Sequence, residues 1–257
     1  MARPDVHAAP RKPGKAMDPR IEQKFAALED SYWWYVGKSR IVREWADSCG
    51  RVLDLGCGTG ALFQQIARQA RAVFGIDFSE VAIAGSRKRV PDAGLSRASV
   101  MDLPFRKSSF DTLVASEILE HLPDDRKALS EWRRVLKPEG RLVATVPAHP
   151  HLWGHHDELC HHERRYRKSE LGGKLSEAGF RVERLSYTFS YLYPVMAALR
   201  PLRRDVKESK ARLHDDFLPV PAAVNWALIR LSALEARWLR KASLPFGASL
   251  IALARKA

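Results

Sequence analysis

Short apolar runs alternate with segments of helical spacing along most of the chain. The apolar runs cover residues 52–55, 73–77, 95–100, 112–116, 141–146 and 180–187, and they predict buried strands. Apolar positions recur every three or four residues over residues 62–69, 80–89, 126–136 and 171–178, which predicts helices. Such alternation predicts an α/β fold with right-handed crossovers onto a mostly parallel sheet.

Capping and breaking residues agree with these boundaries. Ser79 and either Asp124 or Asp125 precede helical segments as N-caps, and Pro19 begins an earlier helix. Residues 137–140 read Lys-Pro-Glu-Gly and predict a stop and turn, and Gly179 closes another helix.

The length and apolar content predict one large core. A chain of 257 residues with 46% hydrophobic residues favours one α/β domain with an insertion. The expected parts are a disordered basic tail (1–17), an N-terminal helical and aromatic lid (18–50), the core (51–191), a helical insertion (192–246) and a closing strand (247–257).

The insertion contains a charged loop over 203–216 and an apolar helical pattern over 222–242. Arg230, Arg237 and Lys241 fall on a narrow polar face of that pattern. The helix fits a lid packed on the domain, a dimer contact or an interfacial membrane helix. We favour the lid or the dimer, because most apolar helical stripes in soluble proteins are packed.

The first strand ends in a glycine-rich turn that typifies a nucleotide site. Residues 51–60 read Arg-Val-Leu-Asp-Leu-Gly-Cys-Gly-Thr-Gly, and a helix is expected from Ala61. Gly56, Gly58 and Ala61 also satisfy the G-x-G-x-x-[GA] pattern, which alone would admit a nicotinamide-dependent dehydrogenase. Asp54 argues against a pyrophosphate here, because two negative groups in one nest repel each other.

Two further acids follow the next strands. Asp77 ends the second apolar run, where a carboxylate can accept both ribose hydroxyls, and Asp102 follows the third. Three acids at successive strand ends suit a ligand with an ammonium, a ribose and an adenine amine. With the D-x-G-x-G-x-G loop, they make residues 51–146 resemble the class I S-adenosylmethionine-dependent methyltransferases.

This resemblance implies a doubly wound, seven-stranded, mostly parallel, Rossmann-like sheet, with the closing strand antiparallel between the fifth and sixth. It also implies S-adenosylmethionine as the cofactor. The residues that it assigns to cofactor binding are Asp54, Gly56, Cys57, Gly58, Gly60, Asp77, Phe78, Met101, Asp102 and Leu103. In the family, residues before the first strand often cover the cofactor.

Four consecutive aromatic residues, from Tyr32 to Tyr35, occupy that position. They could contact the sulfonium or the adenine by cation–π and stacking interactions. Alternatively, Trp33 and Trp34 only plug the edge of the sheet, since tryptophan buries a large area. The sequence leaves both roles open.

The segment after the fourth strand contains Glu117, Glu120 and His121. The Asn-Pro-Pro-Tyr box of many amino-methyltransferases is absent there, which disfavours DNA bases and amide side chains as acceptors. The E-x-x-E-H pattern resembles a magnesium or manganese site of quinone-pathway and small-RNA 2′-O-methyltransferases, with the three residues on one helix face. It also recurs in methyltransferases not known for a metal, so we expect no metal.

The loop over 149–166 carries the densest set of chemical groups. It resembles a bacterial methyltransferase subgroup with L-W-S-x-H-D followed by H-x-R-R-Y, with Gly154 replacing the Ser. The resemblance implies that this loop lines the acceptor pocket, with His156, Asp157, His162 and Tyr166 as catalytic residues and Arg164 and Arg165 binding the substrate. A histidine oriented by a carboxylate is a suitable base at neutral pH, and paired arginines suit a phosphate or carboxylate.

Two other roles compete for the same loop. Arg164, Arg165 and Tyr166 could only anchor the next helix. The histidines could bind zinc, which we do not favour because no thiolate pair or H-E-x-x-H helix accompanies them.

The composition of the chain indicates its expected location in the cell and the charge of its partner. The three cysteines, Cys49, Cys57 and Cys160, form no C-x-x-C pair, so disulfides are not expected and a reducing cytoplasm is the simplest location. No apolar stretch approaches a membrane span, and the N-terminus has no signal-peptide pattern. A formal net charge of +13 favours an anionic partner.

We therefore expect a cytoplasmic methyltransferase, with peripheral contact to the inner membrane face as an option. The acceptor would be an oxygen or nitrogen of a small or lipid-linked, anionic molecule. An RNA 2′-O-methyltransferase with metal assistance is the alternative enzyme, disfavoured because no RNA-binding module is appended. A non-catalytic S-adenosylmethionine-binding protein at a membrane or partner surface is the alternative of another class.

Overall fold

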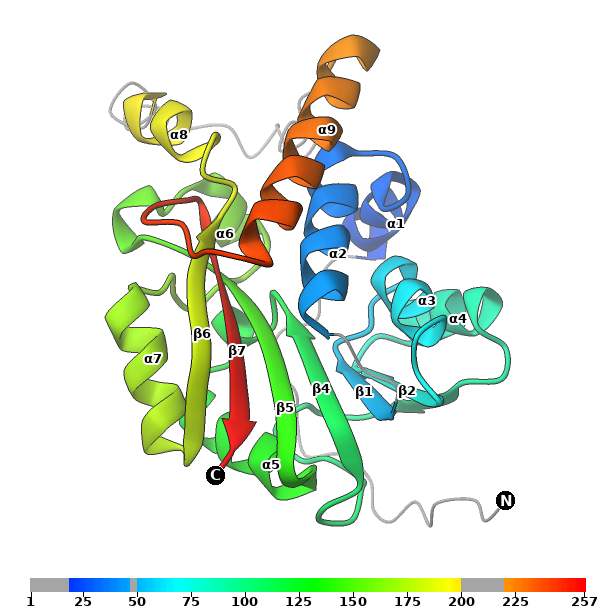
Figure 1. Cartoon of the computed structure of the whole chain (residues 1–257). Coiled ribbons are helices and arrows are strands. Elements are labelled where there is room, and N and C mark those ends of the chain that lie inside the picture. Colours follow the sequence, from blue (N-terminus) through cyan, green and yellow to red (C-terminus); the bar gives the residue numbers. More distant parts are fainter. Residues whose placement is uncertain (1–18, 47–49, 200–219) are drawn as a thin grey trace.

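The computed structural model describes residues 19–46, 50–199 and 220–257 (Figure 1). The predicted tail (1–17) and the charged loop at 203–216 lie outside these residues. Within the described part, no helix combines the length and apolar character needed to cross a bilayer.

Seven strands form one sheet in the order β3-β2-β1-β4-β5-β7-β6. They are β1 (Arg51–Leu55), β2 (Ala72–Asp77), β3 (Gly94–Arg97), β4 (Phe110–Ser116), β5 (Leu136–Pro147), β6 (Phe180–Thr188) and β7 (Ser249–Lys256). All neighbours pair in parallel except β7, which runs antiparallel between β5 and β6. This topology confirms the predicted doubly wound, seven-stranded fold.

Helices cover both faces of the sheet. The long ones are α1 (Pro19–Leu28), α2 (Trp33–Ala46), α3 (Ala61–Ala67), α4 (Glu80–Arg89), α5 (Asp125–Val135), α7 (Lys168–Glu177), α8 (Tyr193–Leu199) and α9 (Ala222–Leu239). Three short turns, η1 (Leu119–His121), η2 (Pro150–Leu152) and α6 (His155–Leu159), lie in the segments that follow β4 and β5. Figure 1 shows α2 and α9 side by side in front of the sheet.

Alternation along the strands divides the core into two layers. Leu53, Leu113 and Leu142 point into the layer with α5 and α7, which includes Trp132. Their neighbours Val114 and Val143 point to the opposite layer, with α2 and α9. Successive side chains of a strand face opposite sides, so apolar runs without polar interruption belong to strands covered on both faces.

Most predicted boundaries agree with the structure within a few residues. Ser79 caps α4 by accepting a hydrogen bond from the Ala82 amide, and Asp124 caps α5 by accepting one from the Lys127 amide. Gly179 takes a positive φ of 82° at the end of α7, which a glycine adopts without steric cost.

Two boundary predictions were wrong. The third strand ends at Arg97 rather than at residue 100, because the Ser99–Asp102 bridge folds that segment into a turn. The predicted turn at 137–140 lies within β5 as an irregularity, where pairing to β4 jumps from Leu136 to Arg141.

Helix α9 packs with its small and polar residues inward. Ser232 and Glu235 are buried, and the Glu235 carboxylate accepts hydrogen bonds from the Phe189 and Ser190 amides and from the Ser190 hydroxyl. Among the large apolar residues of α9, Leu239 is buried, whereas Trp226 is 64%, Leu234 59% and Trp238 57% exposed. The apolar pattern therefore has one face packed on the domain and one face open to solvent, and its role as a lid, a dimer contact or a membrane element stays a prediction.

This orientation predicts that two adjacent alanine substitutions in α9 change the free energy of unfolding by different amounts. Glu235→Ala leaves buried amides without an acceptor, which costs about 1–3 kcal/mol of the free energy of unfolding. Leu234→Ala removes a larger apolar group but from an exposed position, and should change stability by less than about 0.5 kcal/mol. Urea unfolding of both variants measures the contrast. A loss of about 2–5 kcal/mol for Leu234→Ala, typical of a core leucine, would contradict the orientation.

Candidate active site

The glycine turn after β1 forms a backbone cradle. The amides of Gly56 and Cys57 donate to the Ile76 carbonyl at 2.8 and 2.9 Å, which fixes the turn against β2. A Cβ on Gly56 would lie 2.1 Å from the Ile118 side chain, whereas one on Gly58 would meet only Glu29, at 3.8 Å. There is therefore space for a ligand above Gly58. Cys57 points away, into the small core around Phe63.

Asp54 lies beneath this cradle, 1% exposed, and neither carboxylate oxygen has a hydrogen-bond partner. Burial, and then the nearby charge of Asp77, raise the pKa of Asp54 to about 8. An unpaired buried acid is costly, and a cationic group placed in the cradle would compensate it. The donor set thus fits an ammonium group.

Asp77 ends β2 beside the cradle. Its carboxylate accepts hydrogen bonds from the Gly58 amide at 3.0 Å and from the Ser79 amide at 2.8 Å. Burial raises the pKa of Asp77, and these two hydrogen bonds oppose the rise. The carboxylate therefore also holds the glycine turn in place.

The four other residues assigned to the cofactor lie after β2 and β3. Phe78 carries the Arg97 guanidinium 5.2 Å from its ring centre, and Met101 is half-buried. The Leu103 amide donates to Glu131, while the Asp102 side chain is exposed. Among these four, the Asp102 carboxylate is the polar side chain open to an adenine amine.

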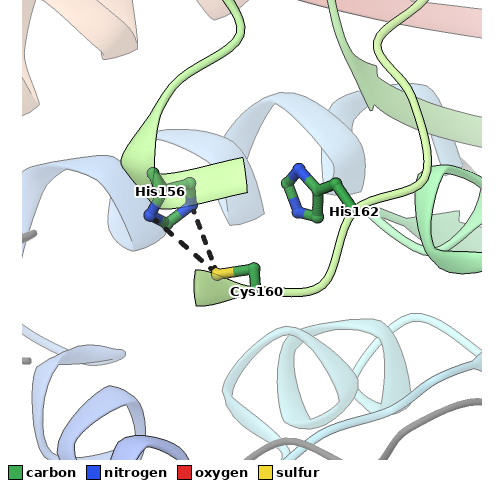
Figure 2. A group of neighbouring side chains, drawn as sticks. All are labelled: His156, Cys160 and His162. Atoms are coloured by element: carbon green, nitrogen blue, oxygen red, sulfur yellow. Dashed lines mark hydrogen bonds between the residues drawn. The ribbon is translucent and has the colours of Figure 1, made fainter. Parts of the chain in front are cut away.

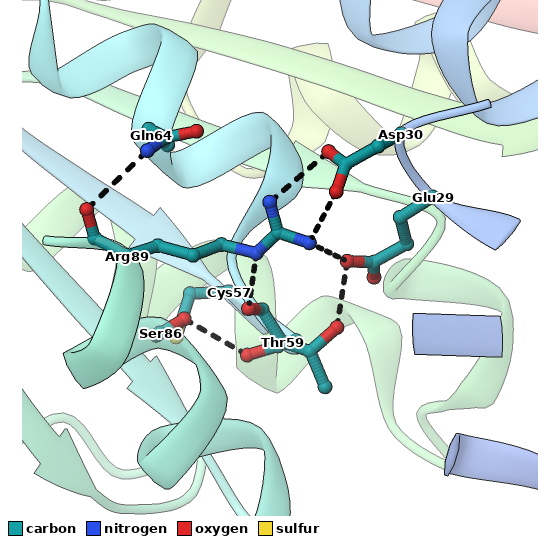
Figure 3. A network of polar contacts seen from close by, with 8 residues as sticks. Glu29, Asp30, Cys57, Thr59, Gln64, Ser86 and Arg89 are labelled. Carbon is teal, nitrogen blue, oxygen red and sulfur yellow. Dashed lines mark hydrogen bonds and ion pairs between the residues drawn. The ribbon is translucent and has the colours of Figure 1, made fainter. Parts of the chain in front are cut away.

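Helix α1 is tied to the cradle by a polar network that the sequence did not reveal (Figure 3). Arg89 of α4 donates to both carboxylate oxygens of Asp30, at 3.0 and 2.8 Å, and to the Thr59 carbonyl at 3.1 Å. The Thr59 hydroxyl donates to Glu29 at 2.6 Å. The segment after α1 thus closes over one end of the cradle.

The aromatic residues before β1 differ in what they contact. Trp34 stacks on Phe189 with ring centres 4.3 Å apart, and Trp33 packs edgewise on the same ring, so both belong to the core. Tyr35 is the one that approaches the site: burial and then the neighbouring Cys160 and Glu29 raise its pKa. Of the two roles that the sequence left open, Trp33 and Trp34 thus have the packing role.

The loop after β5 is organised by Asp157. This buried carboxylate binds the His162 Nδ1 at 2.8 Å, the Arg165 Nε at 2.7 Å and the Gly154 amide at 2.7 Å. Burial alone would raise the pKa of Asp157, but these hydrogen bonds outweigh it and lower the pKa to about 2. Asp157 is therefore ionised, and it orients His162 so that its Nε2 lone pair is available.

The Arg-Arg-Tyr segment anchors the loop instead of facing an acceptor. Arg165 is buried and binds Asp157, and Arg164 binds Asp125 at 3.0 Å. Tyr166 is completely buried, with its hydroxyl donating to Asp125 at 2.8 Å. The catalytic role expected for Tyr166 and the substrate role expected for the arginines do not agree with these positions, because the groups are already used inside the protein.

The E-x-x-E-H segment lies against this loop. The His121 ring is 4.6 Å from the His162 ring, and burial, followed by the charge of His162, lowers the pKa of His121 to about 3. Glu120 is fully buried without a hydrogen-bond partner, and burial followed by Glu117 raises its pKa well above the usual value. Glu117 has a positive φ of 55°, which turns the chain after β4.

One cation in this region was missed by sequence reasoning. Lys38 of α2 lines a small pocket with Glu117, Thr145 and Ser249, at the ends of β4, β5 and β7. Its charge acts on Glu120 and His121. Nothing in the local sequence marks it, because α2 is brought over the strand ends only by packing on α9 and the sheet.

Similarity to known proteins agrees with this geometry. Residues 53–144 match the family described as "Methyltransferase domain". A probable S-adenosylmethionine-dependent methyltransferase of Mycolicibacterium smegmatis is 32% identical over 63% of this chain and 65% of its own length. A demethylmenaquinone methyltransferase of Clavibacter sepedonicus is 39% identical over 43% of this chain and 45% of its own length. The chain thus matches less than two thirds of each relative.

A solved structure extends the likeness to nearly the whole fold. The complex between the Haloferax volcanii Trm112 methyltransferase activator and a putative methyltransferase matches with a TM-score of 0.61, covering 93% of this chain and 95% of that chain at 20% identity. At this identity the match concerns the fold alone. The match over residues 53–144, the sheet order and the glycine cradle above an unpaired acid thus make this chain similar to the class I S-adenosylmethionine-dependent methyltransferases.

Proposed function

We propose that this protein transfers the methyl group of S-adenosylmethionine to an oxygen or nitrogen of a lipid-linked acceptor at an anionic membrane surface. The observation that carries the cofactor assignment is Asp54, a buried carboxyl group without a partner beneath an open glycine cradle. The acceptor assignment depends on the exposed face of α9.

The cofactor would lie across the ends of β1 and β2. Asp54 and the turn of Gly56, Gly58 and Gly60 would hold its methionine part, and Asp77 its ribose. Phe78, Met101, Asp102 and Leu103 would surround the adenine, and Cys57 would contribute only its backbone. When bound, S-adenosylmethionine supplies a methyl group on a sulfonium, so the protein must position the acceptor and remove its proton.

His162 is the proposed proton acceptor. Its Nδ1–H donates to the ionised Asp157, which leaves Nε2 to take a proton and stabilises the imidazolium that results. The side chain is 6% exposed, so little water competes for it. The other histidine that the sequence nominated, His156, contacts Cys160.

The outward face of α9 supports a membrane-bound acceptor. Trp226, Leu234 and Trp238 are spaced at helical intervals on the exposed side, and Arg230, Arg237 and Lys241 are interspersed among or beside them. Exposed aromatic residues next to basic ones are typical of helices that lie in the interface of anionic lipids. The net charge of +13 acts in the same direction. The likeness to a demethylmenaquinone methyltransferase is consistent with a lipid acceptor.

The function itself is tested with methyl-labelled S-adenosylmethionine, supplied in parallel with bacterial lipid extract and with RNA. We expect label in the organic phase. Label that appears only in RNA would contradict the proposal and support the 2′-O-methyltransferase alternative.

Cofactor binding should be coupled to release of a proton. At pH 7 Asp54 is largely protonated because its pKa is raised to about 8, and the arriving ammonium favours the ionised form. Affinity should therefore rise with pH up to about 8. Calorimetry at pH 7 in two buffers of different ionisation enthalpy measures the proton. Asp54→Asn should abolish its release and weaken binding at least tenfold; unchanged affinity would contradict the role of Asp54.

The base assignment predicts a selective loss of turnover. His162→Asn should lower kcat by about 10²–10⁴-fold, the usual contribution of a general base, without changing cofactor affinity. His155→Ala, at an exposed position of the same loop, is the matched control and should retain activity. Full turnover in His162→Asn with saturating cofactor would rule out His162 as the base.

Membrane binding is tested by flotation with anionic and with zwitterionic vesicles. The full chain should float with anionic vesicles, less so at high salt. The Trp226→Ala/Trp238→Ala pair should reduce binding about tenfold or more, because two aromatic anchors are lost. A chain that stays unbound, and instead sediments as a dimer that the double variant abolishes, would show that a second copy covers this face.

A further inference from the structure

We propose that His156, Cys160 and His162 form a binding site for a zinc-class divalent ion, an ion that accepts thiolate and imidazole together. The sequence did not favour zinc for the histidines of this loop, because no thiolate pair accompanies them, but the fold places the single Cys160 beside two of them. The site lies on α6 and the turn that follows it (Figure 2).

The three side chains already converge. One ligand atom of each lies within 4.8 Å of the others, and the Cys160 Sγ is 3.6 Å from the His156 Nε2. In a tetrahedral zinc site with ordinary Zn–S and Zn–N bonds, the sulfur and a nitrogen are about 3.5 Å apart. The pair therefore has the spacing of two ligands of one ion.

Local backbone geometry explains why these residues meet. His156 and Cys160 are four residues apart on one face of the α6 turn. His161 then adopts a left-handed conformation with φ of 55°, which reverses the chain, and the His162 amide donates to the Asp157 carbonyl at 2.8 Å. His162 is thereby returned toward the two preceding ligands, as Figure 2 shows.

The surroundings are those of a metal ligand. His162 donates its Nδ1–H to Asp157, and a histidine that binds a metal through one nitrogen commonly donates the other to a carboxylate. Asp157 is in turn fixed by Arg165. On the far side of His162, Glu120 and His121 each place a ligand atom within 4.8 Å of it, and the Glu120 carboxylate is buried without a partner. A buried carboxyl group without a hydrogen-bond partner thus borders the site.

The donor set selects the ion. Thiolate and imidazole favour zinc and similar transition metals, whereas magnesium and calcium prefer oxygen donors. Binding forms bonds from sulfur and two nitrogens to the ion, and the Cys160 thiol loses its proton to solvent.

Occupancy would have a consequence that rests on the proposed function. The Nε2 of His162 cannot accept a proton and bind an ion at once, so the bound ion would inhibit methyl transfer. Inhibition would be reversed by a chelator.

Cobalt titration of the reduced, chelator-treated full chain tests the site without any acceptor. We expect one ion per chain, a thiolate-to-cobalt charge-transfer band, ligand-field bands of tetrahedral geometry, and displacement by one equivalent of zinc. Cys160→Ser should lose the band and weaken zinc at least a hundredfold. Asp157→Asn should weaken zinc about 10–100-fold, the usual effect of losing such a partner.

Two exposed histidines of the same loop provide the controls. His155→Ala and His161→Asn should bind cobalt as the unaltered chain does, since neither belongs to the converging set and asparagine tolerates the conformation at 161. Absence of stoichiometric cobalt binding, or a charge-transfer band that persists in Cys160→Ser, would overturn the proposal. Zinc that binds without inhibiting supports the site and contradicts only the assignment of His162 as the base.

Discussion

The parallel order of β2, β1, β4 and β5 brings their carboxyl ends to one edge of the sheet, and every candidate functional group depends on this arrangement. This edge holds two acids at adjacent strand ends, Asp54 and Asp77, and their negative charges would repel each other. Such an arrangement is unfavourable in an empty fold. It becomes favourable when a cation completes it, which is why an unpaired carboxyl group is more informative here than the glycine pattern above it.

The loop after β5 satisfies its own charges by a different route. Asp157 is buried with His162 and Arg165, so its carboxylate is fully used. Arg164 and Tyr166 meet at Asp125 in the same way. These contacts hold the loop rigid against η1 and leave the imidazoles as its reactive groups. A hydrogen-bonded frame around a few imidazole nitrogens suits both proton transfer and metal binding, and the two proposed uses compete for one nitrogen of His162.

Patterns in the sequence predicted what depends on neighbouring residues along the chain. Strand alternation, the caps at Ser79 and Asp124 and the antiparallel closing strand followed from apolar spacing, capping chemistry and family resemblance. The features that the sequence did not predict depend on contacts distant in sequence. The direction of α9 is decided by Glu235 meeting the amides after β6, and the role of Tyr166 by Asp125. Lys38 reaches the site only through helix packing, so its sequence position gives no sign of it.

Asp54 is an unpaired carboxyl group that we infer to be protonated in the ligand-free protein and ionised when a cationic ligand binds. Carbon-13 NMR of carboxyl-labelled aspartate, with the Asp54 signal assigned by its loss in Asp54→Asn, measures this directly. We expect Asp54 to have a pKa of about 8 in the ligand-free protein and a pKa well below 7 when S-adenosylmethionine is added. An ordinary pKa of about 4 in both states would contradict this inference.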